Sequence, residues 1–244
     1  MTDLFRLDGQ TALVTGANTG IGQAIAIALG TAGAQVICAS RSPADATLAA
    51  LGTQGRALHL DLSDPMAARD AFTAQPVDIL VNNAGIIRRA DSTDLGEADW
   101  DDVIDLNLKA AFFTTQAFAR AVFARGGQGK VVNIASLLSF QGGIRVASYT
   151  ASKHGIAGVT KVLANEWAAR GINVNAIAPG YIATNNTDAL RADPDRSAAI
   201  LSRIPAGRWG KAQDIAGAAV FLASPAADYI HGTVLSVDGG WMAR

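Results

Sequence analysis

A serine, a tyrosine and a lysine stand near the middle of the chain at spacings that suit proton transfer. Tyr149 follows Ser136 by 13 residues and precedes Lys153 by four. If Tyr149 opens a helix, Lys153 lies one turn further along the same face. An ammonium beside a phenol favours the phenolate, so the pair could exchange protons closer to neutral pH than a free tyrosine, whose pKa is about 10. The spacing predicts general acid/base chemistry, with the Ser136 hydroxyl bonded to the same substrate oxygen that Tyr149 protonates.

Composition is that of a globular protein with one hydrophobic core. The chain has 244 residues, of which 50% are hydrophobic and 17% charged, and its formal net charge is −1. This length fits one large α/β domain over residues 1–244, and the balanced charge argues against a nucleic-acid partner. The single cysteine, Cys38, and an N-terminus without a signal-peptide pattern agree with a cytoplasmic protein that forms no disulfide. The histidines show no metal-ligand spacing and no segment suits a membrane span, so we expect neither a metal nor a membrane partner.

Short β-rich runs alternate with longer helical ones along the chain. The expected strands are Thr11–Thr15, Gln35–Ala39, Ala57–Leu60, Ile79–Val81, Lys130–Ile134, Asn173–Ile177 and Val234–Val237, and the expected helices are Ile21–Ala32, Pro65–Ala74, Trp100–Ala124, Tyr149–Ala169 and Ala212–Ala223. This alternation predicts a doubly wound, Rossmann-like α/β fold, a parallel sheet of about seven strands with helices on both faces. Ligands then bind outside the carboxyl ends of the strands. The polar stretch from about 180 to 210 breaks the alternation and is expected to form a small lid at that edge.

A glycine-rich turn follows the first expected strand and leads into the first helix. Gly16 permits a sharp turn, Gly20 lets the backbone approach a pyrophosphate, and Gly22 lets helix and strand pack closely. The free N–H groups at the start of that helix attract phosphate charge, so the turn predicts a dinucleotide site. The other residues of the turn assigned to this site are Asn18, Thr19 and Ile21.

The ends of the next strands bear on which dinucleotide is bound. An acidic residue after the second strand would accept hydrogen bonds from the adenosine ribose, yet this chain has Ser40 and Arg41 there. Arg41 could pair with the 2′-phosphate of NADP(H) or could be a solvated surface arginine, so the cofactor is NAD(H) or NADP(H), with Arg41 favouring NADP(H). Asp61 and Leu62 are assigned to the adenine end, although aspartate is also an ordinary helix cap. The residues assigned to the cofactor ribose, after the fourth strand, are Asn83, Ala84 and Gly85.

Six sequence elements, taken in order and spacing, resemble the short-chain dehydrogenase/reductase family over nearly the whole chain. They are Gly16-x-x-x-Gly20-x-Gly22, Asn82-Asn83-Ala84-Gly85, Asn107, Ser136, Tyr149-x-x-x-Lys153 and Pro179-Gly180. A tyrosine–lysine pair alone is more often a contact on a helix surface, and no other element is decisive alone. Their joint occurrence in register by chance is very improbable.

The resemblance implies an oxidoreductase that transfers a hydride, and it gives roles to individual residues. In the family, the residue matching Tyr149 is the acid/base, and the one matching Lys153 lowers its pKa and binds the nicotinamide ribose. Ser136 would orient the carbonyl, and Asn107 would support a water in the proton relay. Further cofactor contacts are expected from Pro179, Gly180, Ile182 and Thr184. The resemblance also implies a homotetramer assembled through the helices at residues 100–124 and 149–169, with the C-terminal segment packing against a neighbouring subunit.

Other stretches resemble the members of this family that act on 2-dehydro-3-deoxy-D-gluconate. These stretches are residues 86–89, 139–146, 180–187, 204–210 and 238–244. The resemblance implies a keto sugar acid as the small-molecule substrate. Because a guanidinium suits a carboxylate, we expect Arg145 to hold the carboxylate, with Arg88 as second choice. The side chains expected on the hydroxyls are Gln141, Thr184, Asn185 and Asn186, each of which could instead make a salt bridge or a turn hydrogen bond.

Other functions stay open on the sequence alone. A gluconate 5-dehydrogenase or a 3-oxoacyl-thioester reductase would keep the same chemistry and change the substrate. A sensor that binds the cofactor without reacting belongs to another class. The sensor is disfavoured because silent relatives usually lose the tyrosine or the lysine, and this chain keeps both.

Overall fold

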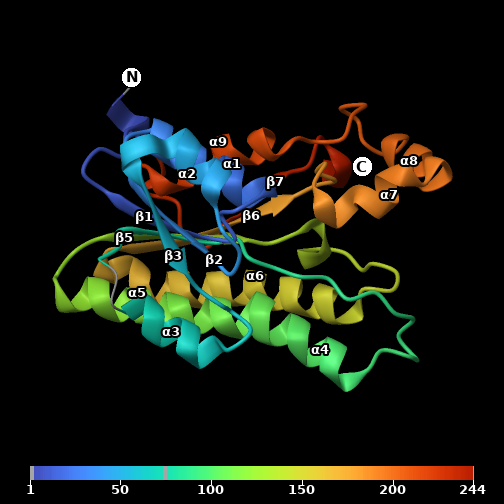
Figure 1. Ribbon diagram of the computed structural model, residues 1–244, viewed down its shortest axis with the longest axis horizontal. Helices are drawn as coiled ribbons and strands as arrows, with labels where there is room; N and C mark the ends of the chain where they lie inside the picture. Colours follow the sequence, from blue (N-terminus) through green and yellow to red (C-terminus); the bar gives the residue numbers. More distant parts are fainter. Residues whose placement is uncertain (1–2, 74–75, 244) are drawn as a thin grey trace.

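The computed structural model describes residues 3–73 and 76–243. These residues form three layers, a central parallel sheet with a layer of helices on each face (Figure 1). In this part of the chain the sheet has seven strands in the order β3-β2-β1-β4-β5-β6-β7, with every neighbouring pair parallel. The strands are β1 (Thr11–Thr15), β2 (Gln35–Ser40), β3 (Gly55–His59), β4 (Ile79–Asn82), β5 (Gly129–Ile134), β6 (Ile172–Pro179) and β7 (Val234–Val237). The predicted doubly wound α/β fold is confirmed. Because the strand order reverses between β1 and β4, their following loops diverge and leave room for a ligand.

Helices cover both faces of the sheet (Figure 1). One layer holds α1 (Gly20–Thr31), α2 (Asp45–Leu51) and α9 (Ala212–Ala223), and the other holds α3 (Pro65–Thr73), α4 (Glu97–Ile104), α5 (Ala110–Ala124) and α6 (Ala147–Trp167). Two short helices, α7 (Asp188–Ala192) and α8 (Pro194–Leu201), extend beyond the sheet at one end. Short 3₁₀ turns span Asp3–Phe5, Gly52–Gln54, Leu137–Ser139, Ala168–Arg170, Asn185–Thr187, Pro225–Ala227 and Trp241–Ala243. Among the described helices, none combines the length and the apolar character that crossing a bilayer requires.

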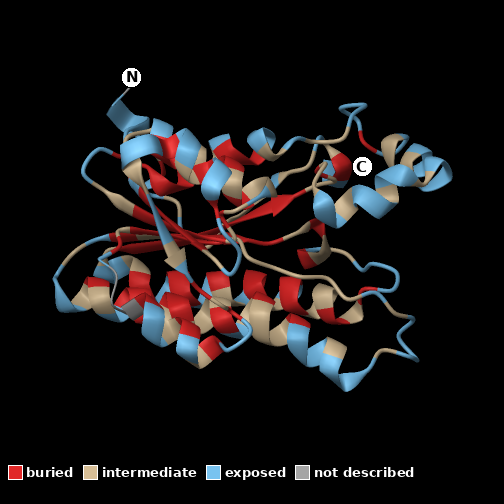
Figure 2. Cartoon of the chain, in the orientation of Figure 1, coloured by how far each residue is buried: buried red, intermediate tan, exposed pale blue. Residues whose placement is uncertain are grey.

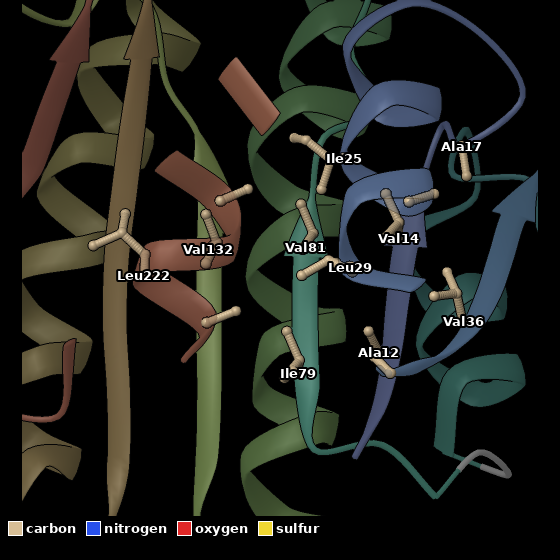
Figure 3. Packing of buried hydrophobic residues seen from close by; sticks show 14 of the residues in the cluster. Ala12, Val14, Ala17, Ile25, Leu29, Val36, Ile79, Val81, Val132 and Leu222 are labelled. Carbon is tan, nitrogen blue, oxygen red and sulfur yellow. The ribbon is translucent and has the colours of Figure 1, made fainter. Parts of the chain in front are cut away.

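The core is built from strand side chains that alternate between the two faces of the sheet. On one face, Val14 of β1 and Val81 of β4 cluster with Leu29 of α1 (Figure 3). On the other face, Leu13 of β1 clusters with Phe118 of α5. Figure 2 shows the buried residues gathered in the sheet and on the inner sides of the helices. Burial on both faces makes the sheet a rigid support for the polar loops at its edge.

The observed elements depart from the expected ones in three places. The sequence pattern does not predict α2, because it has seven residues and buries only Thr47 and Leu51. The helix expected over Trp100–Ala124 begins at Glu97 and is divided by a π-helical turn over Asp105–Lys109. The expected lid stretch contains α7 and α8. The expected end of the helix that begins at Pro65, Ala74, lies outside the described residues.

Two asparagines form a buried polar network in the middle of the sheet. Asn82 Nδ2 of β4 donates to Asn133 Oδ1 of β5 (2.8 Å) and to Thr115 Oγ1 of α5 (2.8 Å). Asn133 Nδ2 in turn donates to Thr160 Oγ1 of α6 (2.9 Å). All four side chains are buried, so each bond satisfies a group that water cannot reach. The network therefore fixes α5 and α6 relative to the two central strands.

Replacing Asn133 should destabilise the fold. Asn133→Ala leaves the Asn82 amide and the Thr160 hydroxyl without this partner, and we expect the free energy of unfolding to fall by about 2 to 3 kcal/mol. Thr31→Ala, at an exposed threonine of α1, is the control and should change it by less than about 0.5 kcal/mol. Urea unfolding measures both, and equal effects of the two substitutions would contradict the role given to the network.

Candidate active site

A cleft of about 780 Å³ lies at the carboxyl ends of the strands. The loops after β1, β2, β3, β4, β5 and β6 line it, together with α7, α8 and the C-terminal turn. Most residues predicted from the sequence reach this cleft. Those that line it are Gly16, Asn18, Thr19, Gly20, Ile21, Ser40, Arg41, Asp61, Leu62, Asn83, Ala84, Gly85, Ser136, Gln141, Tyr149, Lys153, Pro179, Gly180, Ile182, Thr184, Asn185 and Asn186.

The glycine turn at the start of α1 has the conformation that its sequence predicts. Gly16 (φ 66°) and Gly20 (φ 58°) adopt left-handed backbone angles that side chains disfavour. A Cβ on Gly22 would overlap the Gly16 carbonyl oxygen, so Gly22 lies behind the turn and lets it pack tightly. Thr19, the N-cap of α1, makes no side-chain capping bond, and the first turn carries no acidic residue. The N–H groups of this helix start are therefore available to an anion in the cleft.

Hydrogen bonds hold the turn after β1 to the loop after β4. Thr15 Oγ1 accepts from the backbone N–H groups of Asn83 and Ala84, both at 3.0 Å. The Asn83 side chain donates to the Thr15 carbonyl (2.9 Å). Asn83 thus lines the cleft, and its side-chain amide joins the loop after β4 to the turn after β1. These bonds fix the two loops relative to each other at the edge of the sheet.

Arg41 and Asp61 stand at the adenosine end of the cleft, after β2 and β3. Asp61 Oδ1 accepts from the Ser63 N–H (2.9 Å) and the Ser63 hydroxyl (2.8 Å). These two bonds, and to a smaller extent the charge of Arg41, lower the pKa of Asp61. The carboxylate is therefore ionised and orders the loop, and the Arg41 guanidinium lies near it at the cleft wall.

Helix α6 brings the three predicted reactive groups together. It begins at Ala147, so Tyr149 lies in its first turn and Lys153 one turn further on. Lys153 Nζ lies 5.5 Å from the centroid of the Tyr149 ring and donates to the Ile134 carbonyl at the end of β5 (2.6 Å). Ser136 follows β5 by two residues, and its hydroxyl lies close enough to the Tyr149 phenol to lower the pKa of that phenol. The hydroxyls of Ser136 and Tyr149 thus converge beside a buried ammonium.

Burial governs the protonation of this cluster. It raises the pKa of Tyr149, while the hydrogen bond with Ser136 and the charge of Arg89 act in the opposite direction. Burial also lowers the pKa of Lys153 to about 8. For the protein alone the net shift of the Tyr149 pKa is therefore upward, because desolvation of the phenolate outweighs the effects of Ser136 and Arg89. The expected lowering of this pKa by Lys153 stays a prediction.

Asn107 lies in the π-helical turn and is 3% exposed. Its Oδ1 accepts from the Ile86 N–H and its Nδ2 donates to the Ile86 carbonyl, both at 2.9 Å. Nδ2 also lies 3.3 Å from Ser152 Oγ. Asn107 is not among the cleft-lining residues. Its side chain fastens the loop after β4 to α6, and a π turn at this point is typical of functional sites.

Both arginines expected to hold a substrate carboxylate are placed outside the cleft. Arg145 Nε pairs with Asp91 Oδ1 (3.2 Å), and Arg145 has a left-handed backbone (φ 63°). Arg88 pairs with Asp99 (3.2 Å) and Asp102 (3.0 Å). This arrangement does not support the two assignments, which stay predictions, because side-chain direction in an irregular loop follows the local backbone and the adjacent residues face the cleft instead.

Sequence reasoning missed three arginines that do line the cleft. These are Arg89, beside Arg88, and Arg196 and Arg203, in and after α8. Among the described residues of the cleft wall, Asp61 is the one acidic side chain, and it lies at the adenosine end. The other end is therefore strongly positive. For Arg196 and Arg203 the sequence signal was the polar, arginine-containing stretch of residues 180–210, which did not indicate which side chains turn inward.

Two aromatic residues of the wall were also missed, Tyr181 and Trp241. The Trp241 side chain is 5% exposed and packs with Leu137, Ile204 and Tyr181 of its own chain. Trp241 Nε1 donates to Gln141 Oε1 (3.4 Å). Trp241 therefore lines the cleft of its own chain, and the expected packing of the C-terminal segment against a neighbouring subunit stays a prediction.

The chain is similar to known proteins over almost its full length. Residues 16–242 match a family described as Enoyl-(Acyl carrier protein) reductase. The chain is 55% identical to the 2-dehydro-3-deoxy-D-gluconate 5-dehydrogenase of Bacillus subtilis (strain 168), over 99% of this chain and 98% of that protein. It is 53% identical to the protein of the same name from Dickeya dadantii (strain 3937), over 98% of each.

A solved structure agrees with this similarity. A candidate 2-deoxy-D-gluconate 3-dehydrogenase from Agrobacterium tumefaciens, crystallised with bound NADP, is 68% identical, with a TM-score of 0.97 over 99% of this chain and all of that one. The shared fold extends through the lid stretch and the C-terminal turn, since so little of either chain is left out. Together with the motifs around Tyr149, these similarities show that the chain belongs to the short-chain dehydrogenase/reductase family.

Proposed function

We propose that the protein interconverts a secondary alcohol and a ketone of a sugar acid, with 2-dehydro-3-deoxy-D-gluconate as substrate and NADP(H) as cofactor. The observation that carries the proposal is the convergence of Ser136, Tyr149 and Lys153 in a cleft. Around these three residues, the described part of the cleft wall bears arginines and no acidic side chain. A sugar acid matches this wall because its carboxylate needs a cation and its hydroxyls need polar partners.

The residues of the glycine turn fit a dinucleotide. Gly16 and Gly20 leave open backbone where side chains would fill the cradle, and the start of α1 offers N–H groups to a pyrophosphate. Arg41, at the adenosine end, suits a 2′-phosphate. When bound, the cofactor supplies or accepts the hydride. Structures of relatives crystallised with NADP support this choice.

Tyr149 is proposed as the acid/base. A phenol whose pKa is raised keeps its proton at neutral pH and can donate it to the negative charge that develops on a ketone oxygen. Ser136 donates a second hydrogen bond to that oxygen, which stabilises the transition state more than the ground state. Lys153, with its ammonium close to the ring, stabilises the phenolate left behind. Asn107 is proposed to act by positioning the loop after β4 and α6.

Two alternatives differ in what the cleft must hold. A reductase of long acyl thioesters needs an apolar groove, which the arginine-bearing wall does not provide. A gluconate 5-dehydrogenase acts on another sugar acid, so initial rates with gluconate and with 2-dehydro-3-deoxy-D-gluconate distinguish it. A cofactor-binding sensor would show no turnover with either acid.

We also propose that residues 180–210 act as the substrate lid and that the chain forms a homotetramer. Thr184 supports the first point, because it lies over Gly20 within van der Waals reach of a Cβ there (3.5 Å). Support for the second comes from the exposed Trp100 of α4 (41%) and Val162 of α6 (45%), which lie on the two expected interface helices.

Removing the Tyr149 hydroxyl should abolish most turnover. We expect Tyr149→Phe to lower kcat by about 10²- to 10⁴-fold, because the general acid is lost while the ring still packs. Tyr229→Phe, at a fully exposed tyrosine, is the control. Initial rates with a keto sugar acid and NADPH measure the effect, and near-normal turnover of a folded Tyr149→Phe would refute the assignment.

Arg41 should discriminate between the two nicotinamide cofactors. Arg41→Gln removes a charged partner of the 2′-phosphate, so we expect KM for NADPH to rise by about 10- to 100-fold and KM for NADH to stay the same. Arg120→Gln, on the exposed side of α5, serves as the control. Equal changes for both cofactors would argue against a phosphate contact at Arg41.

Lys153 should make stability depend on pH. Its pKa is about 8 in the folded protein and 10.5 without burial, so between these values the unfolded chain holds one more proton and stability rises with pH. Below about pH 8 the cost of burying the ammonium is fully present. We expect the wild type to gain up to about 2 kcal/mol relative to Lys153→Met between about pH 8 and 9.5.

Urea unfolding at the two pH values tests this prediction. Lys161→Met removes an exposed lysine of the same helix and should leave the pH dependence of the wild type unchanged. A constant difference between the wild type and Lys153→Met across the interval would contradict a buried lysine with a lowered pKa.

A further inference from the structure

Arg203 is held against the face of a buried aromatic ring. Its guanidinium carbon lies 4.0 Å from the centroid of the Trp241 ring. Trp241 is itself fixed by its bond to Gln141 (3.4 Å) and by the Tyr181 ring, 4.7 Å away. The platform is therefore rigid, and it orients the guanidinium before any ligand arrives.

Stacking leaves the edges of this guanidinium free. A planar guanidinium contacts a ring through its face, while its N–H donors point outward from its rim. Within residues 3–73 and 76–243, Arg203 forms no ion pair with an acidic side chain. Arg203 also lines the cleft. An oriented and unpaired cation of this kind is a receptor for a planar anion.

We infer that Arg203, laid on Trp241, binds the carboxylate of the substrate, and that the C-terminal turn Trp241–Ala243 is thereby part of the substrate site. The inference rests on the proposed function. Two parallel N–H···O bonds would fix both the position and the plane of the carboxylate. Gln141, bonded to the same tryptophan, stands beside this point and suits a neighbouring hydroxyl.

Apart from Arg41 at the adenosine end, two other arginines line the cleft, and both are less suited to this role. Arg89 is close enough to Tyr149 for its charge to lower the pKa of the phenol, and it donates to the Asn186 carbonyl (3.4 Å). A carboxylate on Arg89 would lie beside the reacting carbon, whereas oxidation at C5 of a hexonate leaves the carboxylate four carbon–carbon bonds away. Arg196 on α8 has no stacking partner among the described rings, and this distinguishes it from Arg203.

Kinetics with a matched pair of substrates tests the inference. The pair is 2-dehydro-3-deoxy-D-gluconate and its C1 amide, which lacks the negative charge. We expect Arg203→Gln to raise KM for the acid by about 10- to 100-fold with little change in kcat, and to leave KM for the amide unchanged. Arg191→Gln is the control, because Arg191 lies on α7, pairs with Asp188 and does not line the cleft.

Trp241 gives a second and independent variant. Trp241→Leu removes the platform and should raise KM for the acid in the same direction, whereas Trp241→Phe should retain most of the affinity. The double variant Arg203→Gln/Trp241→Leu should be no worse than Arg203→Gln, because the tryptophan acts through the arginine. Urea unfolding midpoints confirm that each variant is folded.

The outcomes separate the inference from the proposed function. An unchanged KM for the acid in Arg203→Gln, or equal losses on acid and amide, overturns the inference and leaves the proposed function standing. If the wild type turns over no keto sugar acid, the proposed function fails. Calorimetric titration with D-gluconate then decides the inference, since Arg203→Gln should weaken its binding by the same factor and equal binding would overturn it.

Discussion

The reactive end of this molecule depends on one buried ammonium bonded to one backbone carbonyl. Lys153 Nζ donates to the Ile134 carbonyl (2.6 Å), which ties the first turns of α6 to the end of β5. Because Ser136 lies two residues after the end of β5, the same bond also helps to position its hydroxyl relative to the Tyr149 phenol. The hydrogen-bond network of Asn82 and Asn133 supports this arrangement, because it fixes α5 and α6 relative to the two central strands. The site is thus positioned by polar groups that must be satisfied inside the sheet.

Burial also determines the chemistry. It favours the neutral form of both titrating groups, so the phenol keeps its proton while the lysine is more easily deprotonated than in water. A protonated phenol suits the reduction of a ketone, and the charge of Arg89 supports the phenolate that remains. In the function proposed above, the arginines of the cleft wall serve both the reaction and the recognition of an acid, so that catalysis and specificity would draw on the same electrostatic environment.

The sequence predicted what depends on local periodicity and order. Strand–helix alternation predicted the parallel sheet, and the four-residue spacing of Tyr149 and Lys153 predicted their shared helix face, because helix geometry is a local property. The directions of the arginine side chains were not predicted. Arg88 and Arg89 are neighbours, yet one pairs with acidic residues of α4 and the other lines the cleft, and the left-handed backbone at Arg145 turns its side chain toward Asp91. Trp241 meets Gln141 across 100 residues, which no local pattern encodes.

The most direct measurement of the central claim is the titration of the Tyr149 phenol itself. The chain has three tyrosines, so a protein labelled with ¹³C at the ring Cζ gives few resonances, and Tyr149→Phe identifies the one that matters. We predict that Tyr149 in the protein alone titrates above the ordinary tyrosine pKa of about 10, because burial disfavours its phenolate. Titration of Tyr149 below that ordinary value would show that the lysine, not burial, governs the phenol, and would contradict this interpretation.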